Sequence, residues 1–62
     1  MMKKGDMFTN IKSGEVFIVT SIQSDTVILS TKGNFHSVIT NLNSMDSTFV
    51  PYEEAEKAEK PK

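Results

Sequence analysis

Hydrophobic and polar residues alternate along this chain in short runs that turn-forming residues interrupt. The clearest example is residues 15–30, EVFIVTSIQSDTVILS, where two β-branched runs meet at a polar break over Gln23–Asp25. Alternation over runs of this length is typical of β-strands, and the polar break predicts a hairpin. This hairpin indicates an all-β fold.

Turn-forming residues recur before residue 52, in the segments NIKSG (10–14), QSD (23–25) and KGN (32–34). They bound four predicted strands: Asp6–Ile11, Glu15–Gln23, Thr26–Thr31 and Asn34–Val38. The connections are too short for parallel crossovers, so we expect an antiparallel sheet. Gly14 and Gly33 stand where a tight turn needs a positive φ.

The second predicted strand is apolar on both faces in its first half. Val16 and Ile18 share one face, whereas Phe17 and Val19 share the other, because successive side chains of a strand point to opposite sides. Only one face stays apolar towards Gln23. This pattern indicates a long strand that bends and serves two packed halves of a small barrel.

After the fourth predicted strand, apolar residues recur at separations of three and four: Val38, Ile39, Leu42 and Met45. This spacing predicts a single helical turn. Ser37 or Thr40 would cap its start, and Asp46 with Ser47 would end it.

Phe49 and Val50 predict a short last strand, which Pro51 ends. The sequence therefore predicts a five-stranded SH3-like barrel over residues 1–52, with one short helical turn before the last strand. Residues 53–62, EEAEKAEKPK, contain only Glu, Lys, Ala and Pro, which predicts a charged, flexible C-terminal tail.

Length and composition restrict the function. A chain of 62 residues forms one domain with a minimal core, and without Cys it has neither disulfides nor thiolate metal ligands. No run approaches the roughly 18 apolar residues of a membrane span, and no apolar segment follows the MMKKGD start. We expect a soluble, cytoplasmic protein with no membrane partner.

Seven lysines and no arginine stand against eight acidic residues, for a formal net charge of −1. Arginine is the usual side chain for bidentate recognition of guanine and phosphate, so sequence-specific nucleic-acid recognition is disfavoured. The carboxylates before residue 53 are too few for a DNA mimic.

The segments KKGDMFTNIKSGEVFIVTSIQSDTVIL, KGN and LNSMDSTFVPY resemble the small SH3-like barrel proteins with a KOW-like beginning that are common in bacteriophages and other mobile genomes. The resemblance covers roughly residues 3–52. It implies an adaptor or an inhibitor that docks on a larger host enzyme, and some relatives bind RNA.

Catalytic and metal-binding chemistry is not expected from these residues. His36 is the single histidine, and no second ligand stands at metal-binding spacing from it. The many Ser and Thr hydroxyls lack an adjacent base and an orienting group. We therefore predict no enzyme activity, no cofactor and no metal, and a surface or hydrogen-bonding role for His36.

The predicted function is a non-enzymatic protein-binding module, and its candidate partner-binding residues stand in or beside turns or close the barrel: Lys12, Lys32, Asn34, Phe35, His36 and Tyr52. Phe35 and Tyr52 are the aromatic residues that we expect to be exposed, with Met45 and Phe49 as the next candidates.

Two alternatives stay open. Lys3, Lys4, Lys12 and Lys32 would gather at one end and, with Phe35 or Tyr52 for stacking, bind RNA or single-stranded DNA weakly. A homodimer joined through sheet edges would help so small a core to be stable.

Overall fold

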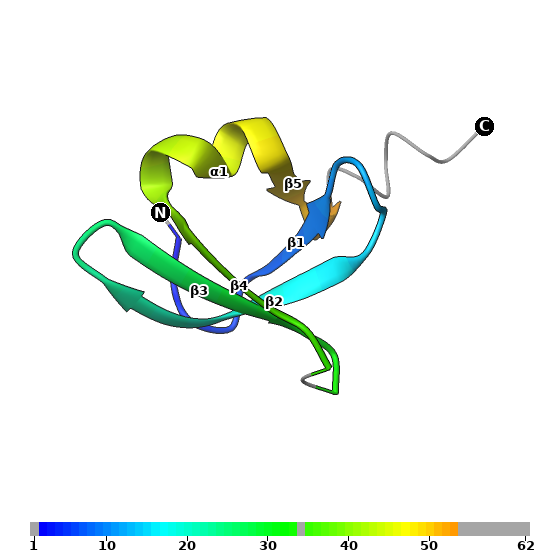
Figure 1. Cartoon of the computed structure of the whole chain (residues 1–62), viewed down its shortest axis with the longest axis horizontal. Coiled ribbons are helices and arrows are strands. Elements are labelled where there is room, and N and C mark those ends of the chain that lie inside the picture. Colours follow the sequence, from blue (N-terminus) through cyan, green and yellow to red (C-terminus); the bar gives the residue numbers. More distant parts are fainter. Residues whose placement is uncertain (1, 34, 54–62) are drawn as a thin grey trace.

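The computed structural model of this chain describes residues 2–33 and 35–53, which form one antiparallel sheet and one short helix (Figure 1). The strands are β1 (Met7–Asn10), β2 (Val16–Gln23), β3 (Thr26–Thr31), β4 (Ser37–Asn41) and β5 (Phe49–Pro51). Their order in the sheet is β4-β3-β2-β1-β5. Helix α1 (Leu42–Thr48) connects the two edge strands, β4 and β5.

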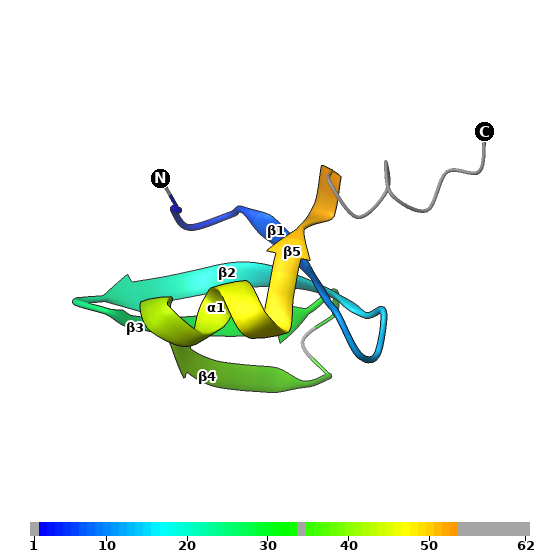
Figure 2. The ribbon, with the colours of Figure 1, turned by 90° about the horizontal axis from the view of Figure 1, so that it is seen from above.

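The sheet curls into a half-barrel, and α1 lies across its open side between β4 and β5 (Figure 2). The predicted all-β fold of five strands, with a short helix before the last one, is confirmed. The predicted tail lies outside the described residues apart from Glu53. Within the described part of the chain, no helix is long and apolar enough to cross a membrane.

The bend predicted for the second strand is a register shift in β2. Val19 pairs with Leu29, but Ser21 already pairs with Ile28, so Thr20 is an extra residue on the β2 side. The Thr20 hydroxyl donates to the carbonyl oxygen of Ile28 at 3.1 Å. A bulge of this kind bends and twists the strand, and it reverses which side chains face inward. Beyond it, Ile22 packs against the core.

The core fills the inside of this curl. Its buried side chains are Phe17, Val19, Val27, Leu29, Met45 and Phe49. Met45 and Phe49 were candidates for an exposed patch, and this prediction is wrong. The physical reason is that α1 and β5 close the open side of the half-barrel, which turns both side chains towards β2 and β3.

The fourth strand was predicted too early in the chain. Its residues Ser37–Asn41 pair with β3 along almost the whole length of that strand, so Val38 and Ile39 are extended rather than helical. The helix therefore starts later than predicted. Its N-cap is Asn41, whose side-chain oxygen accepts from the Ser44 N–H at 2.9 Å.

The predicted end of the helix was also wrong, because Asp46 lies inside α1, which continues to Thr48. Ser47 does not break it, since its hydroxyl donates to the carbonyl oxygen of Ser44 one turn earlier at 3.0 Å. By contrast, the positive φ angles predicted for Gly14 and Gly33 are confirmed, at 79° and 89°.

Candidate protein-binding surface

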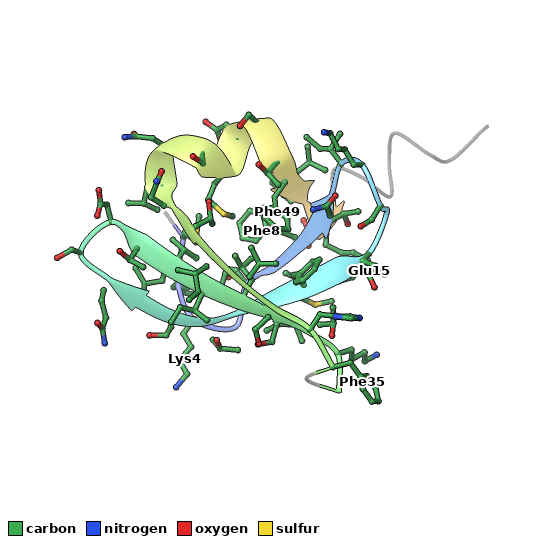
Figure 3. The ribbon with its side chains drawn as sticks, viewed as in Figure 1. Lys4, Phe8, Glu15, Phe35 and Phe49 are labelled. Atoms are coloured by element: carbon green, nitrogen blue, oxygen red, sulfur yellow. The ribbon has the colours of Figure 1, made fainter. Side chains whose placement is uncertain are left out.

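The β3–β4 turn brings three of the predicted partner-binding residues to one tip of the molecule. Lys32, Phe35 and His36 are all exposed there, and the Phe35 side chain has an exposed fraction of 83%. Figure 3 places Phe35 at this tip, pointing away from the sheet. Asn34 was predicted to belong to the same site and lies outside the described residues.

The Phe35 ring is exposed, and it lies against Gly33 of the same turn. A Cβ atom built on Gly33 would be 3.0 Å from Cε2 of the Phe35 ring and 3.2 Å from its Cδ2. A larger residue at position 33 would therefore displace the ring. Glycine thus permits both the positive φ of the turn and the close approach of the ring.

The backbone below this tip is closed by two hydrogen bonds. The Thr31 N–H donates to the His36 carbonyl oxygen at 2.9 Å, and the His36 N–H donates to the Thr31 hydroxyl oxygen at 3.1 Å. The exposed side chains thus stand on a hairpin whose base is closed by hydrogen bonds. A binding surface of this kind loses less conformational entropy when a partner binds.

The free edge of β4 begins directly after this turn. The hydrogen bond from Thr31 to His36 lies at one end of the β3–β4 ladder. At the other end, the Leu42 N–H donates to the Asp25 carbonyl oxygen at 2.9 Å. Hydrogen-bonded pairs alternate along an antiparallel ladder. The N–H and C=O groups of Ser37 and Ile39 therefore point away from β3, towards the open edge.

Ile39 is the largest apolar side chain on this edge, with an exposed fraction of 72%. Sequence reasoning missed it, since the spacing of Val38, Ile39 and Leu42 was interpreted as helical. A second signal could have found it: residues 34–45 contain no Asp, Glu, Lys or Arg. An edge strand usually carries such residues when it faces water.

The outer face of the sheet carries apolar side chains between uncharged hydroxyl residues. Val19 and Leu29 point into the core, so their neighbours Ile18 and Ile28 point outward. Met7 is paired with Ile18, and Ile39 is paired with Ile28, so both lie on the same outer face. Strands β2, β3 and β4 contain no charged residue, and this face therefore continues from β1 to the β4 edge without a formal charge.

Lys12 and Tyr52 lie away from the Phe35 tip. Lys12 is exposed in the β1–β2 turn, at the same end of the sheet but in a different hairpin. Tyr52 follows β5 at the other end of β1, because Pro51 pairs with Phe8 whereas Phe49 pairs with Asn10. It is half-buried and lines an open cleft of about 550 Å³ with residues such as Met2 and Phe8.

The four lysines near the turns do not gather as predicted. The segment before β1, residues 2–6, is called the N-terminal lead. It runs beside the middle of β2, where the Gly5 N–H donates to the Val19 carbonyl oxygen at 2.9 Å. Lys3 there lies 3.9 Å from an Asp6 carboxylate oxygen. Figure 3 places Lys4 well apart from Phe35. The lead therefore separates these two lysines from the turns of Lys12 and Lys32.

Among the described residues, no group of three or more His, Cys, Asp or Glu side chains could hold a metal ion. Comparison of the chain with family models, with curated proteins and with solved structures finds no match. The resemblance to phage-type SH3-like barrel proteins thus stays a prediction. The observations that bear on function are the Phe35 tip, the uncharged outer face and the free β4 edge.

Proposed function

We propose that this protein is a non-enzymatic binding module that docks on a larger protein through the Phe35 tip and acts sterically. The single observation that carries the proposal is the exposure of Phe35 beside the hydrogen-bonded base of the β3–β4 hairpin. The resemblance to phage-type barrels suggests the role of an adaptor or inhibitor of a host enzyme in the cytoplasm.

An exposed phenylalanine gives a folded chain little stability, whereas burial in a partner's pocket is worth about 1.5–3 kcal/mol. Large side chains that fill a partner's pocket carry much of the energy of protein interfaces. The Phe35 ring lies beside Gly33 with most of its surface accessible to a partner. This arrangement favours a protein partner with an apolar pocket.

The surroundings of the tip support the same proposal. Interface centres are depleted of charged residues, and their rims are polar. The outer face of β2, β3 and β4 has no charged residue, whereas Lys32 and His36 stand beside Phe35. Phe35 would form the centre of the interface, and Lys32 with His36 its rim.

The test is affinity capture of the tagged full chain from a lysate of the organism that encodes it, with nuclease treatment, at low and at high salt. We expect one stoichiometric protein that survives both treatments and is lost with Phe35→Ala. Ile11→Ala is the matched control, since Ile11 is also exposed but lies in the β1–β2 turn. Capture that is unchanged by Phe35→Ala would refute the proposal.

The second candidate function is weak binding of RNA or single-stranded DNA. Lys12 and Lys32 are exposed at one end of the sheet, and the free Phe35 ring offers a base a stacking surface. Phosphate contacts would make such binding strongly salt-dependent. Joint replacement of Lys12 and Lys32 by Glu should abolish it without unfolding the protein. Binding that persists in this variant would exclude the lysine end.

A further inference from the structure

The two edge strands of the sheet differ in how well they are protected against pairing with a strand of another chain. β5 has three residues and ends in Pro51, a residue that blocks strand pairing. β4 has five residues, SVITN, without a proline or a charge. Its central residue, Ile39, is among the most exposed large apolar side chains described. β4 is therefore an open site for the addition of another strand.

We propose that β4 pairs with β4 of a second copy of this chain, antiparallel and about a two-fold axis at Ile39. Ile39 would face its own copy across the axis, and Ser37 would face Asn41 of the second copy. The groups that point outward from β4 are those of Ser37 and Ile39, as the bonds at the two ends of the β3–β4 ladder require. This register gives Ile39 reciprocal N–H···O=C bonds with its copy.

The charges of the molecule fit an antiparallel pair. A two-fold axis brings identical residues together, so a charged residue at its centre would repel its copy. β4 has none. Asp25 and Lys32 stand at the two ends of β3, so β4 and its copy would lie between them in the pair, and neither charge opposes the pairing.

The size of the protein adds a reason for association. Among the described residues, six apolar side chains are buried in the core, which is little for an independent domain. Pairing at β4 would join the two sheets into one and cover Ile39 on each copy. Phe35 lies in the turn before β4 and beyond the paired residues, so the dimer does not require it. The inference is therefore independent of the proposed function.

The first test is sedimentation equilibrium of the full chain from low micromolar to millimolar concentration. We expect a reversible monomer–dimer equilibrium. Ile39→Lys should raise the dissociation constant by roughly tenfold or more, because two like charges would meet at the axis. Ile11→Lys is the control, since Ile11 is exposed outside the edge, and it should associate as the wild type does. A monomeric wild type, or an unaffected Ile39→Lys, would overturn the proposal.

The second test fixes the register, and the absence of native cysteine makes it simple. In the proposed pair, the Cα atoms at position 39 would be about 5.5 Å apart, which suits a disulfide. Those at position 37 would be about 13 Å apart, four residues along the strand. Oxidation should therefore cross-link Ile39→Cys rapidly and Ser37→Cys hardly at all. Equal cross-linking of the two variants would overturn the two-fold pairing.

Loss of a different captured protein in Ile39→Lys, with a monomeric wild type, would show that another chain's strand fills the edge and would overturn the dimer. If the wild type sediments as a monomer while capture still depends on Phe35, the dimer fails and the proposed function stands. The two proposals are thus separable.

Discussion

The rings of Phe17 in β2 and Phe49 in β5 meet edge to face, with their centroids 5.4 Å apart and their planes at 80°. β1 lies between these two strands in the sheet, so the contact crosses the inside of the curl. Both side chains are buried. The pair joins the centre of the sheet to its last edge strand and helps to hold the half-barrel closed.

Phe49→Leu should therefore destabilise the fold although it keeps an apolar side chain. The loss of an aromatic pair costs about 1 kcal/mol beyond the change in buried area. Each kcal/mol corresponds to a fall in melting temperature of about 4–8 °C in a domain of this size. Thermal unfolding followed by circular dichroism measures the effect. Phe35→Leu is the control and should leave the melting temperature almost unchanged, because Phe35 makes no core contact. Equal shifts for the two variants would contradict this assignment.

Local patterns predicted the strands that have strong turn signals on both sides. β3 has the predicted bounds, Thr26–Thr31, and its turns are fixed by Ser24 with Asp25 and by Gly33. β4 was misplaced for a physical reason. The spacing of Val38, Ile39 and Leu42 suits a helix as well as a strand, and only pairing with β3 decides between them. Such pairing is a tertiary effect that periodicity does not contain.

The same limit applies to the candidate site. Exposure of Phe35 followed from its position beside a turn. Burial of Met45 and Phe49 did not, because it depends on α1 crossing the open side of the sheet. The separation of Lys4 from Lys32 likewise depends on where the N-terminal lead pairs with β2. Features set by adjacent residues in the sequence were predictable, whereas contacts between elements far apart in the sequence were not.

The contact between Gly33 and Phe35 predicts an energetic coupling. Gly33→Ala should cost about 1 kcal/mol or more, because φ at this residue is 89° and the new methyl group would meet the ring. Gly14→Ala isolates the backbone effect, since φ is 79° there and nothing lies within 4 Å of the added atom. In a Phe35→Ala background, the cost of Gly33→Ala should fall to that of Gly14→Ala. Urea unfolding of the four variants measures the coupling, and additive costs would refute the contact.

The cap of α1 predicts a loss of stability at one asparagine and not at its neighbour. The Asn41 side-chain oxygen accepts from the Ser44 N–H at 2.9 Å, which satisfies a donor that the first turn leaves free. Asn41→Ala should cost about 1 kcal/mol, and Asn41→Asp should be close to neutral because it retains the acceptor. Asn43→Ala, in the same turn of the helix, is the matched control. The midpoint of urea unfolding, compared at one protein concentration, distinguishes them. An equal loss at position 43 would show that the cap is not the cause.

The hydroxyl groups of Ser30 and Ser37 lie 3.1 Å apart across the β3–β4 ladder, and they predict an asymmetric pair of substitutions. Ser30 is buried, with an exposed fraction of 7%, whereas Ser37 is exposed. Ser37→Ala should cost about 1 kcal/mol, because it leaves a buried hydroxyl without this partner.

Ser30→Ala should be nearly neutral, since Ser37 can turn to water. The double variant should be about as stable as Ser30→Ala alone, because the unsatisfied group is then gone. The free energy of urea unfolding, measured at a low protein concentration so that association does not contribute, tests the whole cycle. A larger loss for Ser30→Ala than for Ser37→Ala would mean that water reaches the Ser30 hydroxyl, and that the pair does not stabilise the join between β3 and the open edge strand.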